Sequence, residues 1–149
     1  LDMKIVSTNR KASFDYFLED KFEAGIVLVG SEVKSLRNKE VSLTDTFVLI
    51  RDNQVYLKNL YIKPYDKTTS FIPNERKDRK LLLHKNEILK LQRAVNEKGY
   101  AIIPTKMYFK DHLVKVEIAL AKGKKLYDKR ETIKKRQQDR EISRELKNY

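Results

Sequence analysis

The strongest structural signal in the sequence is the stretch IIPTKMYFKDHLVKVEIALA, residues 102–121. Every second residue from Val114 to Leu120 is a branched aliphatic one, which is the period of a strand that buries one face. The polar run Lys110-Asp111-His112 interrupts the pattern between Ile102–Phe109 and Leu113–Ala121. The stretch therefore predicts a β-hairpin, and with it a β-rich protein.

A second hairpin is expected nearer the N-terminus. Phe47–Ile50 and Val55–Ile62 are rich in β-branched and aromatic residues, and Arg51-Asp52-Asn53 between them suits a turn. From Lys63 to Lys80 the sequence has no hydrophobic period and holds two of the three prolines. We expect a long loop there, of the kind that is usually functional or disordered.

The N-terminal region contributes further strands. Phe14–Leu18 and Phe22–Val29 have strand composition. The charged residues near Asp20-Lys21 leave two interpretations open, which are two separate strand pieces or one bent strand.

A short helix is expected to follow the break at Gly30-Ser31. Ser31 can cap it, and Val33 and Leu36 would share its apolar face, with Glu32 and Lys34 pointing away from that face.

A longer helix is predicted over Asn86–Lys98. Asn86 can cap its start, and Gly99 suits the position just beyond its end. Ile88, Leu91 and Val95 form an apolar stripe at helical spacing.

The order of these elements is strands, short helix, hairpin, helix and hairpin. It predicts a mainly β protein, an OB-type closed antiparallel β-barrel with about three accessory helices and a basic C-terminal tail. We expect residues 1–122 to form the barrel domain and residues 123–149 the tail. Fold alone does not determine function.

The charge points to a polyanionic partner. The 149 residues hold 33 Lys and Arg against 21 Asp and Glu, a net charge of +12, and the pI is near 9.7. Such an excess attracts nucleic acid, although a solubilising surface would give the same composition. There is no long apolar span and no signal peptide, so we expect a cytoplasmic protein without a membrane partner.

The tail is the most basic part. Residues 122–149 hold eleven Lys and Arg and five Asp and Glu, half of the whole excess. No apolar residue lies between Ile133 and Ile142, so we expect that this part cannot pack a helix onto the body. Arg136, Arg140 and Arg144 would form one stripe on a helix. We expect the tail to be disordered when free and helical against phosphates, and the alternative is a solvated terminus with no partner.

Signals for chemistry are sparse. There is no cysteine, the two histidines His84 and His112 are far apart, and no carboxylate cluster suggests a metal site. Phosphate-binding glycine loops and the nucleophile-elbow motif are missing. We therefore expect no catalytic residue, no metal and no cofactor.

Aromatic residues stand beside basic ones at Tyr61, Lys63 and Tyr65, at Lys106 and Tyr108, and at Lys125 and Tyr127. Stacking combined with phosphate neutralisation is typical of RNA-binding surfaces, and ordinary packing of each tyrosine is the alternative. For Glu32 the alternatives are a helix-dipole role in a first turn, or a carboxylate that accepts bonds from a base edge or orients a neighbouring lysine.

Five runs carry a more specific resemblance. They are Asn9-Arg10-Lys11-Ala12, residues 22–26 (FEAGI), residues 30–37 (GSEVKSLR), residues 79–84 (RKLLLH) and residues 123–130 (GKKLYDKR). In this order they resemble the bacterial SsrA-binding protein family, small protein B (SmpB), over nearly the whole chain.

The resemblance implies a partner and a role. Members of that family bind the tRNA-like domain of transfer-messenger RNA and deliver it to stalled ribosomes for trans-translation and ribosome rescue, and they are not enzymes. It also implies contacts with the small-subunit decoding centre and elongation factor Tu in the delivery complex. The tail would fold as a helix in the empty message channel.

The resemblance and the basic pattern together nominate the site residues. For RNA binding they are Glu32, Lys34, Lys80, Leu82, His84, Asn9, Arg10, Lys11, Lys106 and Tyr108. For the ribosome-binding tail they are Gly123, Lys124, Lys125, Tyr127, Asp128, Lys129, Arg130, Lys134, Lys135, Arg136, Arg140 and Arg144. Two other classes stay open, which are a ribosomal protein with an OB barrel and an RNA-cleaving enzyme.

Overall fold

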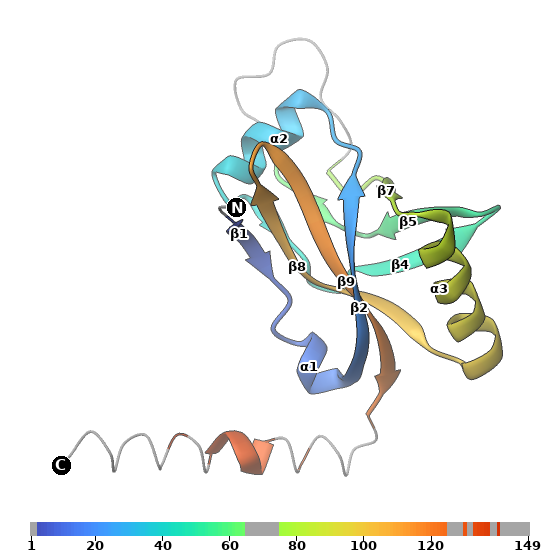
Figure 1. The fold of residues 1–149 in the computed structure, drawn as a ribbon. Coiled ribbons are helices and arrows are strands. Elements are labelled where there is room, and N and C mark those ends of the chain that lie inside the picture. The colour runs from blue at the N-terminus through green and yellow to red at the C-terminus, as the bar shows by residue number, and fades with distance from the viewer. Residues whose placement is uncertain (1–2, 65–74, 125–129, 131–132, 138–139, 141–149) are drawn as a thin grey trace.

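The structure is a computed structural model that describes residues 3–64, 75–124, 130, 133–137 and 140 (Figure 1). Three helices accompany the strands within residues 3–64 and 75–124. In chain order the elements are β1 (Met3–Thr8), α1 (Ala12–Asp15), β2 (Tyr16–Ile26), α2 (Gly30–Arg37), β3 (Val41–Ser42), β4 (Phe47–Arg51), β5 (Gln54–Lys58), β6 (Tyr61–Ile62), β7 (Arg79–Leu82), α3 (Lys85–Lys98), β8 (Ala101–Lys110) and β9 (Leu113–Gly123).

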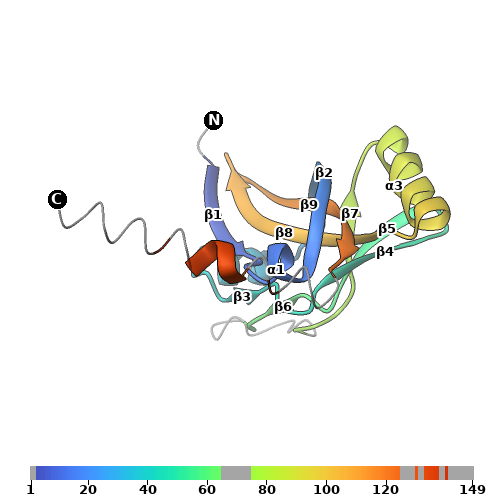
Figure 2. The same ribbon diagram turned by 90° about the horizontal axis from the view of Figure 1, so that it is seen from below.

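Seven strands form one antiparallel sheet in the order β1-β8-β9-β2-β7-β5-β4, and β3 and β6 form a small second pair. The sheet curves strongly, so that β4 at one edge packs against β8 (Figures 1 and 2). The mainly β prediction is confirmed. The described ladder ends at β1 and β4, which do not pair with each other, so closure into an OB-type barrel stays a prediction.

Both predicted hairpins are present. In the first, β8 and β9 pair from Lys110 and Leu113 outward, across a two-residue turn. In the second, Asp52 and Asn53 of the β4–β5 turn have φ of 51° and 61°. Positive φ at both central positions is the geometry of the tight turn that matches strand twist, and Asp and Asn tolerate it well.

The prediction of one continuous strand over Val55–Ile62 is wrong. Asn59 has a left-handed φ of 65°, and the chain turns there, so β5 joins the large sheet and β6 joins β3. The expected loop over 63–80 is also wrong at its end, because β7 begins at Arg79. Residues 65–74 of that loop lie outside the described residues.

The N-terminal third differs from expectation in two places. β1 was not predicted, because Met3–Thr8 has no clear alternation. Phe14 lies in α1 and not in a strand. The bent-strand interpretation of the next region is confirmed, since β2 is one strand whose pairing with β9 shifts register between Leu18 and Lys21.

The short helix begins earlier than predicted and has a different buried face. The N-cap of α2 is Val29 and not Ser31. Its backbone N–H donates to the Glu32 carboxylate at 3.1 Å. Glu32 was expected to point away from the apolar face, yet it is buried together with Leu36.

The long helix is confirmed with a shifted start. The N-cap of α3 is His84 and not Asn86, and the His84 N–H donates to Glu87 at 3.0 Å. Gly99 ends the helix in the left-handed conformation, as predicted. Leu91 and Ala94 are its buried residues, and Val95 is 37% exposed, so the apolar stripe runs through Ala94 rather than Val95.

The larger hydrophobic core lies inside the curved sheet, and α2 and α3 contribute to it through Leu36 and Leu91. A smaller cluster of Ala12, Ile103 and Ala121 lies beside α1. In β5, Val55 and Leu57 face the larger core, and Tyr56 and Lys58 between them are partly exposed. The same strands therefore build the core on one face and a polar surface on the other.

Leu57→Ala tests this division. Leu57 is fully buried, so its truncation is expected to lower the free energy of unfolding by about 2–5 kcal/mol. Leu49→Ala on neighbouring β4 removes the same atoms from a side chain that is 36% exposed, and should cost less than about 1 kcal/mol. Urea unfolding of both variants is the measurement, and equal losses would contradict the assigned faces.

Candidate nucleic-acid interface

A buried ion pair joins α2 to β7. The Arg79 guanidinium donates two hydrogen bonds to Oε2 of Glu32, from Nη2 at 2.6 Å and from Nε at 2.9 Å. The two side chains are 1% and 2% exposed. Removing two charges from water is favourable only when each satisfies the other, and the paired donors of an arginine do this well.

Arg79 also binds the backbone around it. Its Nη1 donates to the carbonyl of Leu60 at 2.6 Å and to that of Lys77 at 3.0 Å, and its Nη2 donates to that of Glu75 at 3.2 Å. The Lys77 ammonium lies 3.6 Å from Oε1 of Glu32. One arginine therefore fixes α2, the start of β7 and the chain beside β6.

These contacts change the interpretation of Glu32. A buried carboxylate already bonded to Arg79 and to the Val29 N–H offers no free edge to a base, so direct base contact is not what the structure supports. The lysine that it contacts is Lys77, and Lys34 lies exposed on α2. A role for Glu32 in RNA binding stays a prediction. Glu32 would affect RNA binding indirectly, because it helps to fix the position of α2.

Sequence reasoning missed Arg79. Arg79 and Leu81 lie on the buried face of β7, and Lys80 and Leu82 lie on its exposed face. An arginine in the buried phase of a strand requires a carboxylate partner, and this was the available signal. The partner lies 47 residues away, which no local pattern could specify.

The solvent face of the sheet gathers several nominated residues. Leu82 pairs with Gly25, Gly25 with Lys115, and Lys115 with Tyr108. Cross-strand partners point to the same face, and Lys80 shares it because it lies two residues before Leu82. Leu82 is 54% exposed. This surface therefore presents an apolar side chain between cations.

His84 belongs to the same surface. With Leu82, Glu23 and Lys115 it lines a hollow of about 340 Å³ beside the start of α3. The structure thus brings Lys80, Leu82 and His84 together, as the RNA-binding prediction requires.

Tyr108 does not offer a stacking surface. Its ring is only 4% exposed, and the Lys106 ammonium lies 5.8 Å from its centroid. Its hydroxyl donates to Glu23 at 2.5 Å. This bond holds the pKa of the Glu23 carboxyl below its ordinary value, and burial together with the same bond raises the pKa of Tyr108. The packing alternative therefore describes Tyr108 in this structure, and a part for Tyr108 in RNA binding stays a prediction.

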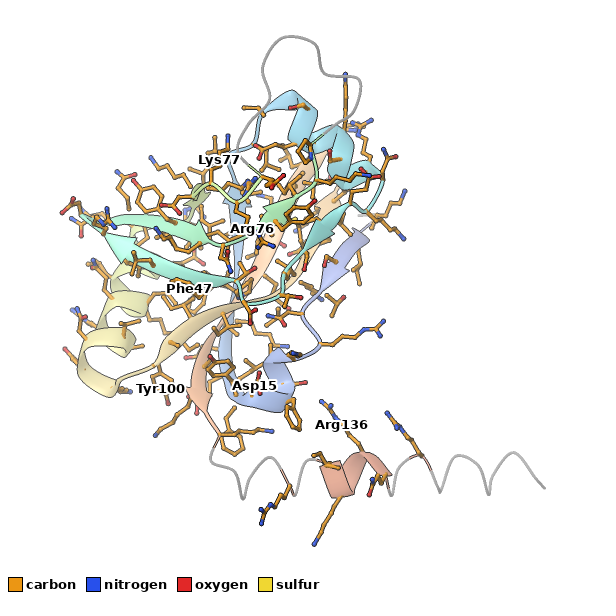
Figure 3. All side chains as sticks on the ribbon, turned by 180° about the vertical axis from the view of Figure 1, so that it is seen from behind. Asp15, Phe47, Arg76, Lys77, Tyr100 and Arg136 are labelled. Atoms are coloured by element: carbon orange, nitrogen blue, oxygen red, sulfur yellow. The ribbon has the colours of Figure 1, made fainter. Side chains whose placement is uncertain are left out.

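A separate basic area lies beside α1. Arg10 and Lys11 are exposed at a groove of about 660 Å³ whose other wall is formed by residues 41–47, including the exposed Phe47 (Figure 3). The Asn9 side chain donates to the carbonyl of Pro104 at 3.0 Å, which fixes the turn that carries the two cations. Asn9 therefore positions this area rather than facing solvent freely.

The described part of the tail lies against α1 (Figures 1 and 3). Lys124 donates to the carbonyl of Ser13 at 2.9 Å and stands 4.9 Å from the Phe17 ring. Arg136 donates to the Ser13 hydroxyl at 3.1 Å and stands 5.9 Å from the Phe14 ring. The described residues from 130 to 140 are all exposed, so Arg136 contacts the body as a single cation on an aromatic ring. The expectation that this part does not pack a helix onto the body stays a prediction.

The other tail residues proposed from the sequence fall into two groups, those that the structure describes and those that it does not. Gly123 ends β9, and residues 130, 133–137 and 140 have helical backbone, which includes Arg130, Lys134, Lys135, Arg136 and Arg140. Lys125, Tyr127, Asp128, Lys129 and Arg144 lie outside the described residues.

In the described ranges, no three His, Asp or Glu side chains gather closely enough to hold a metal ion. No helix there is long and apolar enough to cross a bilayer.

Comparisons with known proteins agree on one family. The model of the family described as "SmpB protein" matches residues 6–148. An SsrA-binding protein of Pelobacter propionicus is 53% identical over 144 residues, covering 97% of this chain and 95% of the relative. That of Caldicellulosiruptor bescii is 51% identical over 148 residues, covering 99% and 94%.

A solved structure is also similar. It is described as "tmRNA-SmpB: a journey to the center of the bacterial ribosome", with a TM-score of 0.67 and 45% identity. The likeness covers 80% of this chain and 85% of the other.

The ion pair gives a first prediction. Arg79→Leu leaves the buried Glu32 carboxylate without its main partner and should lower the free energy of unfolding by about 3–5 kcal/mol. The double variant Glu32→Leu, Arg79→Leu removes both charges and should lose clearly less than the sum of the two single variants. Urea unfolding measures all three, and additive losses would disprove the coupling.

The Tyr108–Glu23 bond gives a second prediction. In Tyr108→Phe the pKa of Glu23 should rise toward its ordinary value, because the bond from Tyr108 is the largest cause of its lowering. A group with a lowered pKa stabilises the fold above its unfolded-state pKa and loses that contribution as pH falls through the folded-state pKa. The variant should therefore lose less stability on acidification. Carboxyl NMR titration measures the pKa, Tyr100→Phe is the control, and an unchanged Glu23 titration would refute the assignment.

Proposed function

Since this chain belongs to the SmpB protein family, we propose that it binds transfer-messenger RNA, the SsrA RNA, and acts with it on stalled ribosomes in trans-translation and ribosome rescue. The observation that carries the proposal is an identity of 53% over 97% of the chain with an SsrA-binding protein. The net charge of +12 suits a partner made of phosphates.

The tRNA-like domain of that RNA is the proposed ligand of the body. Lys80, Leu82 and His84 share one exposed surface, where an apolar side chain and cations can take a ribose or base together with phosphates. Glu32 contributes through Arg79, which fixes α2 and therefore the exposed Lys34. Arg10, Lys11 and Lys106 add charge at other places on the body.

We propose that the body is an OB-type barrel whose seam lies between β4 and β8. The curvature of the sheet, the contact between these two strands and the position of α3 between β7 and β8 support this. Residues 1–122 would form the barrel domain and residues 123–149 the tail.

The tail is proposed to enter the empty message channel as a helix, near the decoding centre of the small subunit. The helical backbone at residues 133–137 and the exposed Lys134 and Lys135 support this, since ribosomal RNA lines that channel with phosphates. The delivery complex would include elongation factor Tu, in the cytoplasm. The chain would act by binding alone, without catalysis.

The decisive experiment is an RNA-binding titration at two salt concentrations. The protein should bind the tRNA-like fragment of transfer-messenger RNA tightly, and this binding should survive higher salt. An ordinary tRNA and an unrelated hairpin of equal length should bind less well and lose binding as salt rises. Equal binding of all three RNAs would favour the ribosomal-protein alternative. Cleavage of any labelled RNA would favour the enzyme alternative.

Truncation separates the body from the tail in the same assay. A chain that ends at Tyr127 should keep its affinity for the fragment within about threefold, because the contacts proposed for it lie on the body. The truncated chain should fail to support tagging on ribosomes stalled in a cell-free translation system. Normal tagging by this chain would disprove the role of the tail.

A further inference from the structure

Another hollow lies at the end of the sheet where α2 packs, away from the surface that Lys80, Leu82 and His84 share. It has a volume of about 470 Å³. Its lining comes from β1 (Lys4, Val6), from α2 and the turn after it (Leu36, Arg37, Lys39), from β8 (Phe109) and from the β8–β9 turn (Asp111, His112).

The hollow has an apolar floor and a cationic rim. Val6 is 8% exposed and Leu36 is buried, and the partly buried Phe109 packs against the same core. Lys4, Arg37 and Lys39 are all exposed around them. Within the described ranges no carboxylate forms an ion pair with any of these three cations. Three basic groups from two segments, β1 and the end of α2, thus line one hollow without an ion pair to a described carboxylate.

Asp111 and His112 complete the rim. Asp111 brings one negative charge against the three positive ones of Lys4, Arg37 and Lys39. His112 is exposed and adds an imidazole that can hydrogen-bond beside the apolar floor. The local charge therefore remains positive.

The backbone at Lys39 is unusual. This residue follows α2 with φ of 59°, and its N–H donates to the carbonyl of Leu36 at 2.9 Å. Helices commonly end with glycine in this left-handed conformation, because a side chain there is disfavoured. Lys39 therefore keeps a long basic side chain at a position where glycine would fit the backbone better.

We infer that this hollow binds one unstacked nucleotide of an RNA ligand. Lys4, Arg37 and Lys39 take the phosphate, and the base or ribose lies on Phe109 and Val6. An apolar floor inside a ring of cations matches a nucleotide, which carries a planar π surface next to a phosphate. An acidic peptide would use the rim but leave the floor uncovered. The inference rests on the proposed function for the identity of the RNA, and it adds a contact separate from Lys80, Leu82 and His84.

The experiment compares two double variants in the full chain. Arg37→Ala with Lys39→Gly removes two rim charges, and glycine suits the positive φ, so the fold should be kept. Lys85→Ala with Lys98→Ala removes two exposed charges from α3 and serves as the control. Urea unfolding of both checks stability.

The measured quantities are the affinity for the tRNA-like fragment of transfer-messenger RNA and its salt dependence. The rim variant should bind at least about tenfold more weakly, and the slope of log K against log salt should become shallower by about one to two. The control should change affinity less than about threefold, because exposed charges outside a contact act only through a screened field. Equal losses in the two variants would overturn the inference.

A crosslinking arm identifies the occupant. With 4-thiouridine at unpaired positions of the fragment, light should attach RNA to the peptide that holds Phe109 and His112, and the rim variant should lose this product. The inference would be overturned if crosslinks formed only in other parts of the chain. It would also be overturned if an added acidic peptide, at equal charge concentration, displaced RNA from the segment that holds Phe109 and His112. If the wild-type chain does not prefer the fragment over an unrelated hairpin, the proposed function fails. The crosslink to the hairpin then still decides whether the hollow binds a nucleotide.

Discussion

The bonds between Arg79 and Glu32 determine how one end of this molecule is assembled. A carboxylate and a guanidinium that are both removed from water have no alternative partner of equal strength, so their positions are mutually fixed. Because Arg79 also holds the carbonyls of Leu60, Glu75 and Lys77, the pair sets where α2 lies on the sheet. The positions of the exposed cations of α2, including Arg37, therefore depend on the buried ion pair, which RNA cannot reach. A change at Glu32 can therefore alter binding without loss of any direct contact.

The sheet shows how one alternation serves two purposes. In β7 the buried Arg79 and Leu81 complete the interior, and Lys80 and Leu82 are left on the outside. The order β9-β2-β7 then places these outward residues in line with Lys115 and Gly25. The proposed binding surface is thus a consequence of the register that builds the core, and a shift of one residue would bury the cations.

The parts of the fold that the sequence predicted are those with a local signal. The β8–β9 hairpin has a clean period of two, and α3 has a helical stripe ending at Gly99. Where the signal was local but weak, the prediction failed. Met3–Thr8 has no alternation, and the left-handed Asn59 that splits β5 from β6 looks like any loop residue.

The site was predicted less completely than the fold, for a related reason. The joint surface of Lys80, Leu82 and His84 followed from runs of neighbouring residues. Arg79 was missed because its role depends on Glu32, 47 residues away. For Tyr108 the choice between packing and stacking stayed open, because the partner of its hydroxyl, Glu23, lies in another strand, 85 residues away.

The contact between β4 and β8 has a last consequence. Edge strand β4 packs against β8, the neighbour of the other edge strand β1, and no ladder joins β4 to β8 among the described residues, so the sheet is, in mechanical terms, a split ring rather than a hoop. A change in its girth would not require breaking the described ladder of backbone hydrogen bonds.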